Sequence, residues 1–281
     1  MAFQMPADAS LAGLTLRTRD REPLTSFYRD LMGLSASGSD GTVRLSPGNG
    51  RFTLTLEITP QAPVRPARAL GLYHFAFLLP TRAALGAVLR RLVEKGSEVD
   101  GASDHIVSEA VYLRDPEGNG IELARDRPRK AWRYTNGQLT MLSELLDVDG
   151  LLAAAPAASG LDKSTRLGHV HLSVDDLPRG EVFYAGGLGL TVTQRTYPGA
   201  LFLAAGDYHH HLGMNIWGAR RPAPPGATGL VNYTWRVPAG TLDALEPHLA
   251  QQGIAASRMD GRLTFTDPIG VQVVVTEDGL S

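Results

Sequence analysis

The stretch "LGHVHLSVDDLPRGEVFYAGGLGL" (167–190) repeats, almost position for position, the stretch "LAGLTLRTRDREPLTSFYRDLMGL" (11–34). Each has a segment that reads as a strand, then an Asp, an "FY" pair and a "GL" ending. In the earlier copy Leu24, Phe27, Tyr28 and Leu31 recur at the spacing of a half-buried helix. The sequence therefore predicts one unit, a strand followed by an amphipathic helix, that occurs at least twice.

Two further stretches are related to each other in the same way. They are "LGLYHFAFLLPTRAALGAVLRRL" (70–92) and "TGLVNYTWRVPAGTLDALEPHL" (228–249), and in both a Pro closes the strand. More strands follow the helices: "RFTLTLEIT" (51–59) alternates polar and apolar residues, and "YLRDPEGNGIEL" (112–123) reads as two strands around a Gly-rich turn. "FTDPIGVQVVV" (265–275) is interpreted as a shortened counterpart of the latter. An internal repeat of this kind predicts an α+β fold of four βαβββ modules.

The four modules suggest a division of the chain into two halves. Residues 1–127 hold modules one and two, and residues 162–281 hold modules three and four. Between them, residues 128–161 break the pattern. There "LSELLDVDGLLAAAPAAS" (142–159) is interpreted as a helix that runs into an Ala/Pro linker.

Composition narrows the class of protein. The chain has 281 residues, a net charge of −2 and no cysteine. The absence of cysteine excludes disulfides, thiolate catalysis and Cys-type zinc sites, so a metal would be bound by His and carboxylate. No basic footprint for nucleic acid is present, and no apolar run is long enough to cross a bilayer. Without a signal-peptide pattern the default expectation is a cytoplasmic protein. The sequence leaves the oligomeric state open, a homo-oligomer included.

Histidines in the repeat raise the question of a metal site. His169 and His171 alternate along a predicted strand, so their side chains point to the same face. A lone histidine on such a strand is more often a core residue than a ligand. The interpretation of His169 therefore depends on partners elsewhere in the chain.

The motifs "GLYHFAFLLP", "DPEGNGIEL", "GHVHL" and "DYHHHLGMNIW" resemble those of the vicinal oxygen chelate superfamily. This superfamily includes glyoxalases, fosfomycin-resistance proteins and type I extradiol dioxygenases, and the motifs look most like the branch of Bacillus-type catechol 2,3-dioxygenases. The resemblance covers nearly the whole chain and implies two half-open β-barrels. It also implies iron held by two His and one Glu. One His comes from the first strand of one module, and the other His and the Glu come from the first and last strands of its partner.

Aligning the modules tests each pairing for a complete ligand set. The first-strand positions, in module order, are Gly13, His74, His169 and Asn232; the last-strand positions are taken as Glu122 in module two and Gln272 in module four. Modules one and two then lack one ligand, and modules three and four lack two. Modules two and three together supply His74, Glu122 and His169. We therefore expect modules two and three to form the active half-barrel, and modules one and four to form a metal-free one.

The resemblance also implies residues that handle protons. Tyr112 matches the tyrosine that hydrogen-bonds a substrate oxygen in extradiol enzymes, and module four is read as carrying Phe265 there. Strand alternation leaves open which of His209, His210 and His211 enters the cleft, and the family alignment favours His210 as the acid/base. His105 falls near the place of a histidine that contacts a substrate hydroxyl, with a spacing that differs by about two residues.

These observations predict an extradiol dioxygenase that cleaves a catechol-type aromatic diol with O₂. Two His and one carboxylate leave open coordination positions, as in non-haem Fe(II) oxygenases; Mn(II) suits the same ligands. A glyoxalase-type lyase or isomerase is an alternative, but its fourth ligand would fall near Gly213. A fosfomycin-type transferase and a non-enzymatic protein that sequesters small molecules are the others. The identity of the catechol is left open.

Overall fold

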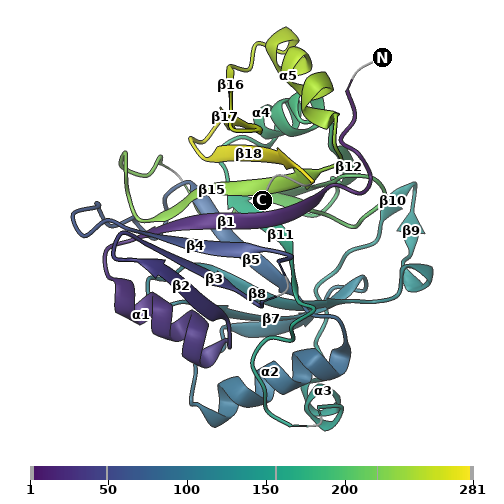
Figure 1. The fold of residues 1–281 in the computed structure, drawn as a ribbon. Helices are drawn as coiled ribbons and strands as arrows, with labels where there is room; N and C mark the ends of the chain where they lie inside the picture. Colours follow the sequence, from purple (N-terminus) through teal and green to yellow (C-terminus); the bar gives the residue numbers. More distant parts are fainter. Residues whose placement is uncertain (1–2, 49, 156, 220, 279–281) are drawn as a thin grey trace.

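The computed structural model describes residues 3–48, 50–155, 157–219 and 221–278. Its main strands form two eight-stranded sheets, whose strands are labelled in Figure 1. One sheet has the order β16 (Ala256–Met259), β17 (Arg262–Thr266), β18 (Gln272–Glu277), β15 (Gly229–Val237), β1 (Ser10–Thr18), β4 (Thr53–Ile58), β3 (Thr42–Ser46), β2 (Ser35–Ser39). The other has the order β12 (Thr191–Gln194), β13 (Ala200–Ala204), β14 (Leu212–Asn215), β11 (Arg166–Ser173), β5 (Gly71–Leu78), β8 (Gly120–Asp126), β7 (Ser108–Arg114), β6 (Gly101–Asp104).

Each module contributes half of a sheet. Within a module the first and last strands pair in parallel, as β5 does with β8 and β11 with β14. Two modules then meet through their first strands, which pair antiparallel: β5 with β11, and β1 with β15. This confirms the α+β fold of four βαβββ modules and the pairing of module two with three and one with four.

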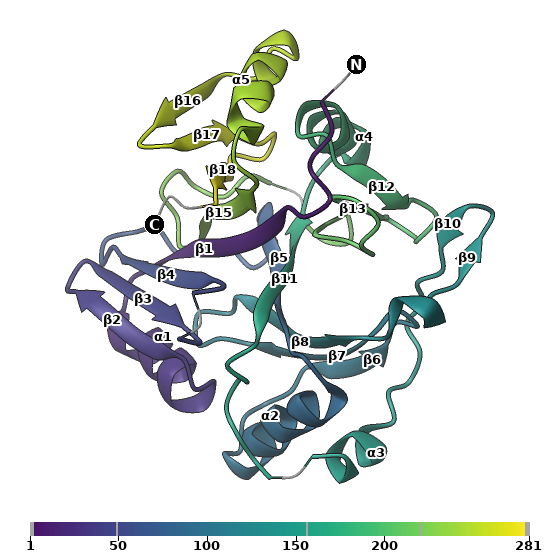
Figure 2. The same ribbon diagram turned by 45° about the vertical axis from the view of Figure 1, so that its right-hand side comes forward.

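The two sheets contact each other through their central strands. β1 contacts β11, and β15 contacts β5, so a single hydrophobic core runs through both sheets. In Figure 2 the wings of the second sheet, β6–β8 below and β12–β13 above, open toward β9 and β10. The second sheet is therefore a half-barrel whose hollow side faces away from the first sheet.

The helices follow the first strands, as predicted. α2 (Arg82–Glu94) and α5 (Thr241–Gln251) are regular, and Thr81 caps α2 by accepting a hydrogen bond from the Ala84 N–H. The helices of modules one and three are α only at their start, in α1 (Arg21–Ser26) and α4 (Leu177–Glu181). They continue as π-helices over Phe27–Leu31 and Val182–Gly187, which contain the "FY" pairs.

The tyrosine of each "FY" pair links modules that are adjacent in sequence. Tyr28 of module one donates a hydrogen bond to Asp115 of module two, with 2.9 Å between oxygens. Tyr184 of module three makes the same contact with Asp267 of module four, at 2.6 Å. All four residues are buried. The repeat therefore contains a polar contact between the two sheets.

The register of module four corrects two of the module equivalences. His74 pairs with Gly120 and Asn232 with Gln272, so Gln272 corresponds to Gly120, and the counterpart of Glu122 is Val274. Because Tyr112 lies opposite Glu122 and Thr264 opposite Val274, Tyr112 corresponds to Thr264 and not to Phe265. The two turns have equal length, since Asp115 and Asp267 each accept the N–H four residues on, and the second turn is not shortened. Val274 offers no ligand, so the pairing argument is unaffected.

The connecting segment contains less helix than predicted. It has a 3-10 turn (Arg129–Ala131), the short strands β9 (Tyr134–Thr135) and β10 (Gln138–Leu139), and one helix, α3 (Val148–Ala153). Residues 142–147 are not helical because Glu144 forms a bridge with Asp104. Pro156 of the Ala/Pro linker lies outside the described residues, and the division at 127 and 162 stays a prediction. Among the described residues, no helix combines the length and apolar character needed to cross a membrane.

Candidate metal centre

Three predicted ligands come together on the hollow face of the second sheet. His74 lies on β5 and His169 on β11, the two strands where modules two and three meet. Glu122 lies on β8, where it is the neighbour of Ala76, two residues beyond His74. Since alternate strand residues share a face, His74 and Glu122 point to the same side of the sheet.

The three side chains form a nearly equilateral triangle of ligand atoms. The Nε2 atoms of His74 and His169 are 3.1 Å apart. The Oε2 atom of Glu122 is 3.1 Å from His74 Nε2 and 3.2 Å from His169 Nε2. All three residues are buried, and among the described residues they form the one group of this kind that could hold a metal ion.

This triangle fits one face of an octahedral ion. With ligand distances of about 2.1 Å, adjacent ligand atoms are about 3.0 Å apart in an octahedron and about 3.4 Å apart in a tetrahedron. The two separations of 3.1 Å lie closer to the octahedral value, and the third, of 3.2 Å, lies midway between the two values. Two imidazoles and one carboxylate on one face form the set typical of non-haem Fe(II) oxygenases.

The protonation states also suit metal binding, which requires neutral histidines and an ionised carboxylate. Burial alone raises the pKa of Glu122, but the charges and hydrogen bonds of His169 and His74 outweigh it and hold this pKa well below its ordinary value. Burial lowers the pKa of His169. These shifts favour the ionised carboxylate of Glu122 and the neutral imidazole of His169.

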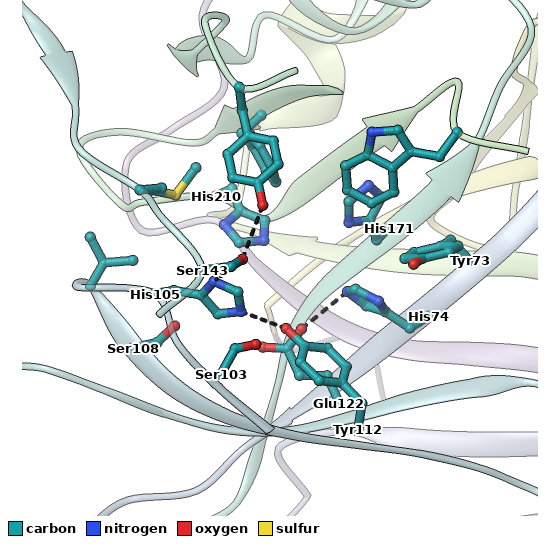
Figure 3. Close-up of a pocket in the computed structure, with 15 residues that line it drawn as sticks. Tyr73, His74, Ser103, His105, Ser108, Tyr112, Glu122, Ser143, His171 and His210 are labelled. Carbon is teal, nitrogen blue, oxygen red and sulfur yellow. Dashed lines mark hydrogen bonds and ion pairs between the residues drawn. The ribbon is translucent and has the colours of Figure 1, made fainter. Parts of the chain in front are cut away.

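His74 and Glu122 of the triangle line a cavity of about 280 Å³, shown in Figure 3. His210, Tyr112 and His105, the predicted proton-handling residues, line the same cavity. The imidazole of His210 lies against that of His169, with 4.1 Å between ring centroids. The structure thus brings all six candidate residues to one place.

The hydrogen bonds of His105 fix how it meets Tyr112. His105 Nδ1 is 2.7 Å from the carbonyl oxygen of Leu142, which can only accept, so Nδ1 carries a proton. In the neutral imidazole Nε2 then accepts from the Tyr112 hydroxyl, which is 2.6 Å away. Burial, together with the charge of Glu122, raises the pKa of Tyr112 well above its ordinary value, so this phenol stays protonated.

The three consecutive histidines point in different directions. His210 faces the metal triangle, with burial lowering its pKa well below the ordinary value. His209 turns away and contacts Asp126 at 2.9 Å. His211 lines a different cavity, and its Nδ1 accepts a hydrogen bond from the Ala205 N–H. The contact between His209 and Asp126 was not expected from the sequence, because no motif marks Asp126.

An aromatic wall of the cavity was also missed. Tyr73 packs against Trp217 at 5.5 Å between centroids, and Trp217 against Tyr197 at 6.1 Å. Phe202 continues the wall beside Tyr197. These residues come from β5, the loop between β12 and β13, β13 itself and the segment after β14, so only the folded chain places them together.

Gly213 occupies the place where a fourth carboxylate would be expected. It lies opposite His171, two residues beyond His169, just as Glu122 lies opposite Ala76, two residues beyond His74. A Cβ at Gly213 would be 2.9 Å from Cγ of His171, so the His171 ring fills this space. His171 is a buried part of the cavity wall, and its Nε2 has no hydrogen-bond partner among the described residues.

Comparison with known proteins places the chain in a family. The model of the glyoxalase/bleomycin resistance protein/dioxygenase superfamily matches residues 10–123 and 166–275. The chain belongs to this superfamily. The two matched ranges are the two halves of the sequence, each holding two modules.

Two curated relatives carry names that specify a reaction. Catechol-2,3-dioxygenase of Bacillus subtilis (strain 168) is 40% identical over 268 residues, which is 92% of this chain and 93% of that protein. Biphenyl-2,3-diol 1,2-dioxygenase 3 of Rhodococcus globerulus is 29% identical over 140 residues, 48% of this chain and 74% of that protein.

Two solved structures share the fold over nearly the whole chain at low sequence identity. A structure from Bacillus subtilis subsp. subtilis str. 168 has a TM-score of 0.72 and 13% identity, covering 99% of this chain and 87% of that one. Glyoxalase I from Zea mays has a TM-score of 0.61 and 16% identity, covering 97% of this chain and 94% of that one. At these identities the likeness concerns the fold alone.

Proposed function

We propose that this protein is a metal-dependent extradiol dioxygenase that cleaves a catechol-type substrate beside its two hydroxyls. The observation that carries the proposal is the triangle of His74, Glu122 and His169, two members of which, His74 and Glu122, line the same cavity as His210 and Tyr112. A relative with 40% identity over nearly the full length, named for this reaction, supports it.

The three ligands would hold Fe(II), and Mn(II) suits the same donor set. When bound, this metal supplies the place where a vicinal diol and O₂ meet and the route for electron density between them. The protein holds these ligands on three adjacent strands of one sheet, with His74 and Glu122 at the wall of the cavity.

His210 is assigned the acid/base role. Its burial keeps the imidazole neutral, so it can accept the proton of a substrate hydroxyl and later return it to the reacting oxygen. Its ring lies against that of His169, which places it next to the ligand triangle. An imidazole in this position is next to the hydroxyl oxygens of a substrate that binds at the triangle.

Tyr112 and His105 are assigned to substrate binding. Because the Tyr112 proton is directed at His105 Nε2, the phenol oxygen offers its lone pairs to a substrate hydroxyl. His105 in turn is anchored to the Leu142 carbonyl. The pair therefore presents a fixed acceptor across the cavity from His210.

A four-ligand lyase of the glyoxalase type is disfavoured by Gly213. The carboxylate that such a site needs would have to displace the buried His171 ring. A protein that only sequesters small molecules would have no use for three buried ligand atoms at mutual distances of 3.1–3.2 Å.

The proposal is tested by loading the anaerobically purified protein with Fe(II), Mn(II) or Zn(II) and adding catechol with O₂. We expect equimolar consumption of catechol and O₂ with Fe(II) or Mn(II), formation of a 2-hydroxymuconic semialdehyde, and no turnover with redox-inert Zn(II). Tight binding of catechol without O₂ uptake in any metal form would contradict the proposal.

A further inference from the structure

His209 lies between His210 and a carboxylate, on the side away from the cavity. His209 Nδ1 is 2.8 Å from His210 Nδ1, and His209 Nε2 is 2.9 Å from Asp126 Oδ1. Both histidines are buried, whereas the Asp126 side chain is 24% exposed. A chain of three hydrogen-bonding groups thus runs from the metal cavity to a partly open carboxylate.

The packing around His209 leaves its ring little freedom. Trp132 meets it edge to face at 5.4 Å between centroids, and Tyr208 lies against it at 4.1 Å. The Tyr208 hydroxyl also donates to Asp126, at 3.0 Å from Oδ2. Both carboxylate oxygens of Asp126 therefore accept a hydrogen bond, and the two aromatic contacts restrict rotation of the His209 ring.

The direction of each hydrogen bond follows from donor and acceptor types. An ionised carboxylate only accepts, so His209 Nε2 must donate to Asp126. In neutral His209 the other nitrogen, Nδ1, has no proton and must accept from His210 Nδ1. Neutral His210 then carries its proton on Nδ1 and a lone pair on Nε2.

We propose that Asp126 and His209 are positioning residues that fix the tautomer of His210, so that its Nε2 is the proton acceptor on the cavity side. This inference rests on the proposed function, in which His210 is the acid/base.

The same chain accounts for the proton that His210 takes up. When Nε2 gains a proton from substrate, the Nδ1 proton of His210 passes to Nδ1 of His209. His210 is again neutral, and the positive charge resides on His209 against the Asp126 carboxylate. The reverse shift returns the proton to product. The charge is in this way kept off the ring that stacks on His169.

Asp126 does not line the metal cavity but a different one. It lines a second cavity of about 400 Å³ together with Tyr208, His211 and several arginines, among them Arg129 and Arg166.

The tautomer is measured directly by long-range ¹H–¹⁵N correlation in histidine-labelled, full-length protein loaded with diamagnetic Zn²⁺. Loss of one ring pattern in His210→Gln assigns the His210 signals. We expect the Nδ1–H form in the wild type. In Asp126→Asn the amide can donate to His209, and in His209→Phe the acceptor is gone, so both should shift His210 toward the Nε2–H form. Tyr208→Phe, which leaves the carboxylate and the chain intact, is the control and should keep the wild-type tautomer.

Kinetics of the Fe(II)-loaded variants give the second readout. We expect kcat for catechol to fall about 10- to 100-fold in Asp126→Asn and His209→Phe, the range seen when partners of site residues are lost, with KM within about threefold of the wild type. Asp126→Glu, which keeps the carboxylate, should recover most of kcat.

A wild-type His210 with its proton on Nε2, or an Asp126→Asn variant with unchanged tautomer and kcat, overturns the inference. If His209→Phe does not fold, the tautomer of His210 and the kcat measured in Asp126→Asn still test the inference. A wild type that consumes no O₂ with catechol counts against the proposed function, whereas the tautomer result separately decides the orientation of His210.

Discussion

The Nε2 atoms of His74 and His169 lie 3.1 Å apart, although 95 residues separate the two histidines in the chain. They meet because the first strands of modules two and three, β5 and β11, pair antiparallel at the centre of one sheet. A metal bound here would join the two halves of the sequence. The ligand set is accordingly incomplete in either half alone.

Replacing Glu122 should therefore abolish stoichiometric metal binding. Glu122→Gln keeps the shape of the side chain but removes the charge that a divalent ion needs, and we expect metal content after Fe(II) loading and desalting to fall from near one per chain to a small fraction. Glu57→Gln is the matched control, because Glu57 lies on β4 of the other sheet, outside the ligand triangle, and pairs with Arg17. Elemental analysis of both variants is the measurement. Full metal content in Glu122→Gln would contradict the assignment.

His210→Gln should separate metal binding from catalysis. His210 contacts His169 but is not in the ligand triangle, so metal content should stay near that of the wild type. Loss of an acid/base group lowers kcat by about 10²- to 10⁴-fold. O₂ uptake with catechol and elemental analysis are measured on the same preparation. Equal loss of metal and activity would indicate that His210 acts as a ligand.

Much of this site follows from the sequence because its signal is periodic. The module repeat predicts where the first strands begin, and the distribution of His and Glu over the modules predicts which of them pair. Both are local patterns, and because alternate residues of a strand share a face, such patterns also predict which side chains point the same way. The pairing of modules two and three is confirmed on this basis.

Other features depend on contacts that no local pattern encodes. The equivalence of Glu122 and Val274 depends on turn length, which the capping hydrogen bonds of Asp267 determine. The helix predicted from 142 fails over 142–147 because that segment bridges to Asp104. Asp126 and His209 are 83 residues apart, so their contact could not be predicted before the fold.

Acid should destabilise the protein through its buried histidines. Burial, with the charges of His209, His169 and Arg166 adding to it, lowers the pKa of His211 from 6.5 to about 3. Between these values the unfolded chain binds more protons than the folded one, so stability falls as the pH drops below 6.5. For His211 the loss at pH 5 is about 2 kcal/mol.

Urea unfolding of the metal-free protein at pH 8 and pH 5 measures this effect. His211→Asn can still accept from the Ala205 N–H but does not titrate, so its loss of stability between the two pH values should be smaller by about 2 kcal/mol than that of the wild type. An equal loss in both proteins would show that His211 is already protonated in the folded state or titrates normally.

Tyr28→Phe should destabilise the protein without affecting the metal site. The variant removes a hydrogen bond to a buried carboxyl, Asp115, whose pKa burial raises. Loss of such a bond costs about 1.5–3 kcal/mol of unfolding free energy. Tyr134→Phe is the control, since Tyr134 is 61% exposed and should change stability little. Metal content of Tyr28→Phe should equal that of the wild type, and a stability equal to the Tyr134→Phe control would show that the contact contributes nothing.

The cavity should discriminate against charged catechols. Among the described residues, its wall holds aromatic and apolar side chains such as Trp217, Phe202 and Met141, and no Lys or Arg lines it. A carboxylate on the ring would be desolvated there without a counter-ion, beside the negative charge of Glu122. We expect 3,4-dihydroxybenzoate to bind at least about 100-fold more weakly than 4-methylcatechol, measured anaerobically by competition. Met141→Lys supplies a cation to the same wall and should narrow that ratio, whereas Met141→Leu should leave it unchanged. Equal affinity of the wild type for both ligands would mean that the ring substituent lies outside this cavity, directed to solvent, and that the aromatic wall does not select the substrate.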